Sequence, residues 1–160
     1  MEIVLRKIEP NDNDAIGAIV RNVLTEFNCN RPGTAYADPQ TNYMYQYYTQ
    51  PGHAYFIVLV DGILAGGAGI GVLPDVKQIC ELQKMYLSPA YRNLGLASKL
   101  LTVCINTAKE YGYTSMYLET MPELKRAIQF YQQKHFETLE APLAHTGHNA
   151  CSIWMLRTLA

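Results

Sequence analysis

The sequence predicts an α+β domain built on a mixed, mostly antiparallel sheet. Short segments of alternating apolar residues come first, and two of them flank a dipeptide typical of a tight hairpin. A strand–helix–strand–helix order follows in the second half. Apolar residues make up 49% of the 160 residues and charged residues 17%, which suffices for one hydrophobic core. We therefore expect one domain over residues 1–160.

The N-terminal segment predicts a strand followed by two helices. Residues 2–8 alternate in polarity, and Asn11 or Asp12 then offers an N-cap for the apolar helical pattern of residues 16–27. The segment 39–50 is rich in tyrosine at i, i+4 spacing, which favours a second, short helix.

The centre of the chain predicts a β-hairpin. Residues 54–60 and 63–72 read as strands, and Asp61-Gly62 between them is typical of a two-residue turn. Four glycines in the second strand should weaken or bend it.

The second half predicts the alternation of strands and helices. Its expected elements are a strand at 78–87, a helix at 94–111, a strand at 114–120, a helix at 123–134, and strands at 135–139 and 150–157. Hairpins followed by a strand–helix–strand–helix unit predict an α+β fold with a mixed sheet.

Charge and composition exclude several classes of function. Thirteen basic and fourteen acidic residues give a net charge of −1, so no strong positive field is available to bind a nucleic acid. No apolar stretch approaches the roughly 20 residues of a membrane span, and the N-terminus is charged where a signal peptide is apolar. We expect a cytoplasmic protein with no membrane partner. Its four widely spaced cysteines should be reduced thiols, with Cys80 and Cys104 in the core.

The segment with the clearest chemistry is Arg92-Asn-Leu-Gly95-Leu-Ala97, which joins a strand to a helix. The first turn of a helix carries unpaired N–H groups and partial positive charge, and it can bind a phosphate. Gly95 permits close backbone approach, and Arg92 adds a permanent cation, so a pyrophosphate would fit. Alternatively, the glycine serves only a tight strand-to-helix turn.

A second motif makes the assignment more specific. With Ala127-Ile-Gln-Phe-Tyr131 and the downstream His135-Phe136, residues 55–157 resemble the GNAT family, the GCN5-related N-acetyltransferases. The family's motif is R/Q-x-x-G-x-G/A, and here Ala97 replaces the last glycine. The family pattern has a glycine at 135 and often an asparagine at 124, where this chain has His135 and Leu124.

The resemblance implies an acyl-CoA N-acyltransferase-like, three-layer fold, with helices flanking a sheet that a bulge splays between its fourth and fifth strands. It also implies transfer of an acetyl group from acetyl-CoA, as cosubstrate, to a primary amine of a small molecule or peptide. Attack would be direct, in a ternary complex. The alternative is a CoA or acetyl-CoA sensor or interaction module without turnover. A monomer or a homodimer is consistent with the family.

The resemblance also implies site residues. The Met85 N–H would hold the thioester oxygen. The cofactor-binding residues would be Met85, Tyr86, Leu87, Arg92, Asn93, Leu94, Gly95, Leu96, Ala97, Ser98 and Tyr131.

Proton transfer needs an acid and a base. Tyr131 corresponds to the family's tyrosine near the CoA sulfur and would be the general acid, although by itself it reads as an inward aromatic residue. In some branches of the family a glutamate at the spacing of Glu81, four residues before Met85 on the same strand, draws a proton from the amine, so the resemblance makes Glu81 the candidate base. It could instead be a surface residue paired with Lys84 or Lys77. Glu119 is the next candidate.

In this fold the acceptor usually lies between the early helices and the last hairpin, so the resemblance implies that residues 26–48 and 137–149 form its walls. Candidate binding residues are Glu26, Tyr43, Glu119 and His148, within walls that also hold Tyr36, Asp38, Tyr47, Glu140 and His145. An acidic and aromatic lining favours a cationic amine, although the tyrosines could simply pack the short helix.

Two histidines and a cysteine, His145, His148 and Cys151, have the spacing of metal ligands. No fourth ligand is evident nearby except His135. The segment reads more simply as a loop that returns to the sheet, and we expect no metal.

Overall fold

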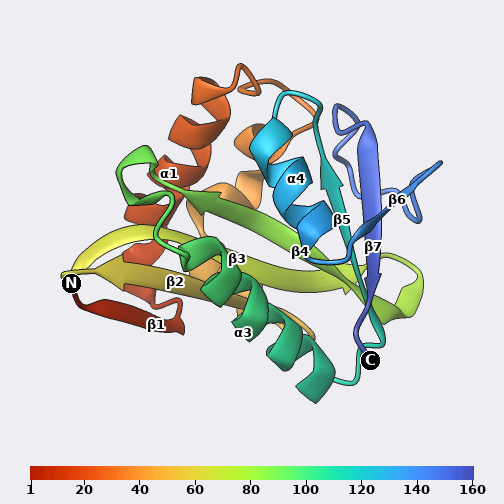
Figure 1. The fold of residues 1–160 in the computed structure, drawn as a ribbon, viewed down its shortest axis with the longest axis horizontal. Coiled ribbons are helices and arrows are strands. Elements are labelled where there is room, and N and C mark those ends of the chain that lie inside the picture. The colour runs from red at the N-terminus through yellow and green to blue at the C-terminus, as the bar shows by residue number, and fades with distance from the viewer.

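The computed structural model describes residues 1–160 and contains one seven-stranded sheet with helices on both faces (Figure 1). The strand order is β1-β2-β3-β4-β5-β7-β6, and only the β4–β5 pair is parallel. The strands are β1 (Ile3–Lys7), β2 (Ala54–Val60), β3 (Ile63–Leu73), β4 (Val76–Leu87), β5 (Ser115–Thr120), β6 (Glu137–Leu139) and β7 (Ile153–Thr158). The predicted mixed, mostly antiparallel sheet is confirmed.

Four α-helices cover the sheet: α1 (Asn13–Glu26), α2 (Met44–Tyr48), α3 (Leu96–Glu110) and α4 (Lys125–Gln133). Alternate residues of β2 point to opposite faces, as strand geometry requires. Phe56 and Val58 join a core with α3, whereas Tyr55 and Ile57 join a second core with α1 and α2. The result is the expected three-layer arrangement, with α1 and α3 on opposite sides of the sheet (Figure 1).

Several element boundaries differ from the expected ones because of left-handed residues. Helix α3 begins at Leu96, two residues later than expected, since Asn93 and Gly95 have φ values of 64° and 75°. Strand β6 begins only at Glu137 because His135 has a φ of 69°. The segment 39–50 is a 3₁₀ turn (Pro39–Asn42) followed by α2, and not one helix.

The glycines of β3 do not interrupt the strand, which runs over eleven residues. A Cβ atom on Gly67 would lie 2.5 Å from the ring of Tyr55, and one on Gly71 would lie 2.7 Å from the side chain of Gln83. The glycines therefore leave room for side chains of the neighbouring strands to lie across β3.

A bulge separates β4 from β5. Between the pairs Gly67–Tyr86 and Gly69–Gln83, two residues of β4 lie opposite the single residue Ala68 of β3. One of the two is Lys84, with a φ of 48°. Strand β4 pairs with β5 only over Ile79–Glu81. The predicted splay is thus confirmed, and the remainder of β4 faces a gap.

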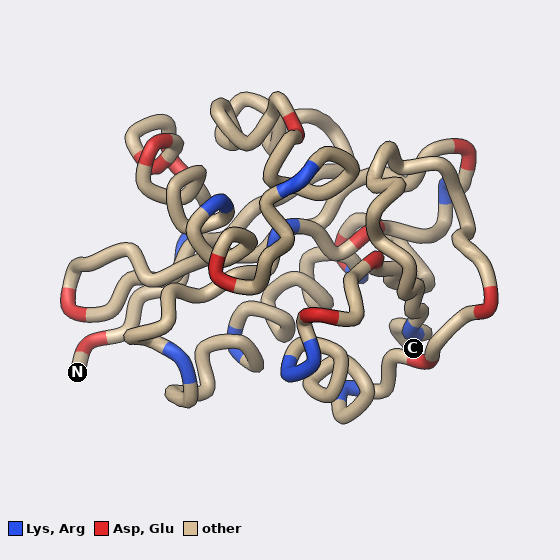
Figure 2. Tube along the Cα trace, turned by 90° about the horizontal axis from the view of Figure 1, so that it is seen from above, with Lys and Arg blue, Asp and Glu red and all other residues tan.

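Charged residues of both signs are scattered over the backbone trace (Figure 2). None of the helices combines the length and apolar character required to cross a lipid bilayer.

Candidate active site

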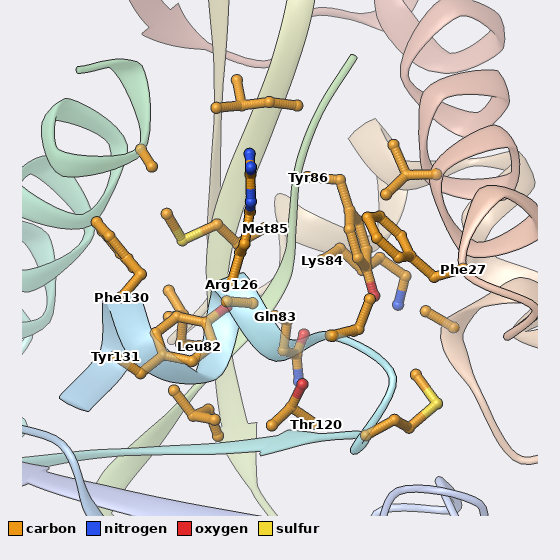
Figure 3. Close-up of a pocket in the computed structure, with 18 of the residues that line it drawn as sticks. Phe27, Leu82, Gln83, Lys84, Met85, Tyr86, Thr120, Arg126, Phe130 and Tyr131 are labelled. Carbon is orange, nitrogen blue, oxygen red and sulfur yellow. The ribbon is translucent and has the colours of Figure 1, made fainter. Parts of the chain in front are cut away.

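A mainly apolar cavity of about 400 Å³ occupies the gap between β4 and β5. Residues 81–87 of β4 form one wall, and α4 and the end of β5 form the other (Figure 3). The loop before α3 and its first turn close one end. The cavity therefore joins the predicted cofactor loop to both predicted acid–base residues, Tyr131 and Glu81.

The first turn of α3 has the geometry of an anion site. Gly95 is the N-cap residue, and a Cβ atom added to it would meet no heavy atom within 4 Å. The N–H groups that follow, on Leu96, Ala97 and Ser98, belong to the turn that has no intrahelical acceptors. All three residues and Gly95 line the cavity. Free space above unpaired amides fits a diphosphate.

Arg92 lines the same end of the cavity, but its charge is already compensated. Its two terminal nitrogens each lie 2.8 Å from a carboxylate oxygen of Glu26, and its Nε donates to the Leu87 carbonyl at 3.1 Å. The guanidinium also lies over the ring of Phe27, 5.5 Å from its centroid. The hydrogen bonds from Arg92 lower the pKa of Glu26. Glu26 is therefore a partner of the cofactor loop and does not line the cavity.

Glu81 is 4% exposed and lies where β4 and β5 separate. Its Oε1 accepts a hydrogen bond of 2.7 Å from Gln83 Nε2, two residues along the same face. Burial raises the pKa of Glu81 to about 7, although the Gln83 bond opposes this rise. Glu81 forms no ion pair with Lys77 or Lys84. Lys84 instead forms an ion pair with Asp38 at 2.9 Å.

Glu119 and His148 converge on Glu81. One carboxylate oxygen of Glu81, one carboxylate oxygen of Glu119 and one ring nitrogen of His148 all lie within 4.8 Å of one another. Glu119 accepts hydrogen bonds from Tyr117 Oη, at 2.7 Å, and from Thr146 Oγ1. Burial raises the pKa of Glu81 to about 7, and the hydrogen bond and charge of Asp38 raise that of His148 against the opposing effect of burial. Two carboxyl groups and an imidazole this close together can exchange protons, so we call Glu81, Glu119 and His148 the acid–base cluster.

His145, His148 and Cys151, which have the sequence spacing of metal ligands, do not form a common cluster in the structure. His145 is exposed, and Cys151 is a buried free thiol on the wall of the cavity. All four cysteines are free and buried, including Cys80 and Cys104.

Tyr131 projects from α4 into the cavity wall (Figure 3). Its ring packs edge-on against Phe130 and Phe136, and its hydroxyl has no hydrogen-bond partner within the chain. Burial raises the pKa of Tyr131 above its ordinary value, so the phenol stays protonated. It can donate a hydrogen bond to a ligand in the cavity.

The other predicted acceptor residues lie elsewhere. Tyr43 is 46% exposed and does not line the cavity, and Glu140 is exposed as well. Two of the six tyrosines between 36 and 55, Tyr48 and Tyr55, are buried, and the Tyr55 hydroxyl donates to the carbonyl of Lys84 at the bulge.

Sequence reasoning missed Arg126, which reaches from the first turn of α4 into the pocket (Figure 3). It has no acidic partner within the chain. Its position four residues before Phe130, on the same helical face, is the signal that could have identified it.

The fold and cavity define an acyl-CoA acyltransferase-like protein, and comparison with known proteins gives the family. A family model described as "Acetyltransferase (GNAT) family" matches residues 20–136, and the chain belongs to this family. It is 43% identical over 158 residues to the uncharacterised N-acetyltransferase YjgM of Escherichia coli, covering 98% of this chain and 95% of that one.

Solved structures agree on the fold. An acetyltransferase of the GNAT family from Staphylococcus aureus superposes with a TM-score of 0.88 at 21% identity, covering 99% of this chain and 100% of that one. The yncA protein of Salmonella typhimurium, whose structure contains acetyl-CoA, gives 0.77 at 19% identity, covering 100% and 95%.

Proposed function

We propose that residues 1–160, acting as one domain, transfer the acetyl group of acetyl-CoA to a primary amine of a small molecule or peptide. The reaction is a direct attack in a ternary complex. One observation carries the proposal: a buried carboxyl group with a pKa of about 7 lies in the cavity that also contains an open helix N-terminus. Family membership and the acetyl-CoA complex of a structural relative support it.

The diphosphate of acetyl-CoA would bind the N–H groups of Leu96, Ala97 and Ser98. The open space at Gly95 supports this fit. Arg92 would have to share its guanidinium with Glu26 or release it, whereas Arg126 offers a cation with no competing partner. Asn93 and Leu94 would contribute through the backbone of the same loop.

The pantetheine arm would extend along the part of β4 that does not pair with β5, next to Met85, Tyr86 and Leu87. Acetyl-CoA supplies the activated acetyl group as a thioester. The Met85 N–H, in the bulge, is our candidate to donate to the thioester oxygen, where negative charge develops. The hydrogen bond from Tyr55 to the Lys84 carbonyl stabilises the bulge.

Glu81 is our candidate general base and Tyr131 our candidate general acid. An alkylammonium with an ordinary pKa of about 10.4 must lose a proton before it can attack, and a base with a pKa near 7 suits this task. The departing thiolate, with an ordinary pKa of about 8.5, needs a donor. The phenol of Tyr131 has no competing partner within the chain and can donate to sulfur.

The acceptor site that we propose consists of Glu81, Glu119 and His148. The carboxyl groups of Glu81, Glu119 and Asp38 lie there, with Lys84 and His148 as the basic side chains. A cationic amine would be attracted to these carboxyl groups. We do not extend the acceptor role to Glu26, which is paired with Arg92, or to Tyr43, which is exposed.

A thiol-release assay with acetyl-CoA and a panel of polyamines, amino acids and aminoglycosides tests the proposal. We expect turnover with at least one cationic amine. Glu81→Gln should lower kcat/KM by about 100-fold, since a general base contributes that much or more. Glu110→Gln, at the exposed end of α3, is the control and should match the wild type. Tight acetyl-CoA binding without transfer to any amine would favour a CoA sensor instead.

We place this activity in the cytoplasm. Four free, buried cysteines fit a reducing compartment.

A further inference from the structure

His148 joins the acid–base cluster to a fourth group, Asp38. Its Nε2 lies 2.7 Å from Asp38 Oδ2, and its Nδ1 lies 3.8 Å from Glu119 Oε1. The same Oδ2 of Asp38 accepts a hydrogen bond of 2.9 Å from Lys84 Nζ. Asp38 therefore contacts both the bulge of β4 and the loop that precedes β7, and His148 in that loop is 110 residues away from Asp38 in the sequence.

The members of this cluster differ in their access to solvent. Glu81 and the side chains of Glu119 and Lys84 are at most 4% exposed, whereas the side chain of His148 is 17% exposed. Asp38 is exposed to a similar extent, but its ion pairs keep it charged: burial raises its pKa, and the bonds from His148 and Lys84 outweigh that effect and lower it. His148 is therefore the group through which a proton can leave the cluster.

The contact with Asp38 fixes the orientation of the imidazole. When neutral His148 donates its Nε2–H to Asp38, the lone pair of Nδ1 faces the carboxylates of Glu119 and Glu81. The separation from Glu81, at most 4.8 Å, is within the span of one bridging water.

We propose that His148, oriented by Asp38, relays the acceptor's proton from Glu81 to solvent, and that Asp38 is a positioning residue for this relay. The inference rests on the proposed function. The N–H bond of the ammonium breaks as the proton moves to a Glu81 oxygen. That proton then passes to Nδ1 of neutral His148, and the imidazolium so formed releases one proton to water and returns to the neutral imidazole. One proton leaves per acetyl group transferred, and Glu81 returns to its carboxylate form.

The charges around His148 suit this role. Asp38 faces it from the loop before α2, Glu81 and Lys84 from β4, and Glu119 from β5. Burial lowers the pKa of His148, but the hydrogen bond and charge of Asp38, helped by Glu81, outweigh burial and Lys84 and raise it. The contact with Asp38 thus makes His148 a better proton acceptor than burial alone would allow.

The relay is tested with His148→Gln, and with His145→Gln as the control from the same loop. His145 is exposed and lies outside the cluster. Each folded variant is assayed for thiol release between pH 6 and 9 with the best acceptor. We expect His148→Gln to lower kcat by about tenfold or more while the Kd for acetyl-CoA is unchanged, and His145→Gln to match the wild type.

Chemical rescue separates a relay from a merely structural role. In His148→Ala, added imidazole should raise kcat in proportion to its concentration, and a series of small buffers should do so according to their pKa. In Asp38→Asn, the NMR titration of His148 should shift to lower pH, together with the acid limb of the kcat profile.

Wild-type kcat in His148→Gln, or no rescue of a folded His148→Ala, would overturn the relay. If Glu81→Gln is impaired and His148→Gln is not, the relay fails and the proposed function stands. If the wild type acetylates no amine, the proposed function itself fails.

Discussion

Two glycines with similar positive φ values flank α3, and they provide a matched test of the proposed cofactor loop, residues 92–98. Gly95 precedes the helix with a φ of 75°, and Gly112 follows it with a φ of 86°. A Cβ atom would meet no heavy atom within 4 Å at either position. Only Gly95 lines the cavity. Replacing either glycine with valine should therefore destabilise the fold by a similar amount. Only the valine at position 95 would also add a side chain where the diphosphate is proposed to bind.

The expected magnitudes follow from this comparison. A left-handed non-glycine residue costs roughly 1–2 kcal/mol, so both variants should unfold a few degrees below the wild type. At Gly95 the branched side chain would also keep the diphosphate away from the helix N-terminus. Loss of two charge-assisted hydrogen bonds, at about 1.5 kcal/mol each, weakens binding roughly 100-fold.

Calorimetry with CoA, together with thermal denaturation, measures both effects. We expect Gly112→Val to bind CoA with the wild-type Kd and Gly95→Val to bind about 100-fold more weakly, with similar losses of thermal stability. Equal Kd values for folded Gly95→Val and the wild type would refute the location of the diphosphate. Equal weakening in both variants would show that the loss comes from the backbone and not from the site.

Three further predictions concern the cavity. The raised pKa of Glu81 means that the folded state loses stability as pH rises from 4.5 to about 7, so Glu81→Gln should gain on the order of 2 kcal/mol relative to the wild type between pH 5 and pH 8 in denaturant titrations; a constant difference would contradict burial of an ionisable carboxyl. Tyr131→Phe should lower kcat about tenfold or more and leave the Kd for acetyl-CoA unchanged; an unchanged kcat would remove Tyr131 as the acid. Arg126→Gln should weaken CoA binding several-fold and make it less dependent on salt, whereas the paired Arg92 should tolerate the same substitution better; the opposite ranking would assign the phosphate contact to Arg92.

Local sequence patterns predicted most of the sheet and the loop-to-helix turn before α3, because their determinants are close in sequence. The Asp61-Gly62 turn sets the β2–β3 hairpin. Gly95 marks the N-terminus of α3, although the left-handed conformations of Asn93 and Gly95 place the start of the helix two residues later than expected. Glu81 and Gln83 share a face through simple strand alternation.

The acceptor side could not be predicted in the same way, because long-range contacts build it. The Asp38–His148 pair joins two irregular loops that have no periodic pattern. Glu26 was expected at the acceptor, but the end of α1 lies beside the cofactor loop and its carboxylate binds Arg92. Glu81 had an equally plausible surface role until the structure showed that Lys84 pairs with Asp38.

A crystal structure of the protein with acetyl-CoA tests the central claim most directly. We predict the diphosphate on the amides of Leu96 to Ser98, the thioester oxygen within about 3 Å of the Met85 nitrogen, and the sulfur beside the Tyr131 hydroxyl. A cofactor bound outside the β4–β5 gap, or one whose thioester lies far from both Met85 and Glu81, would contradict the account.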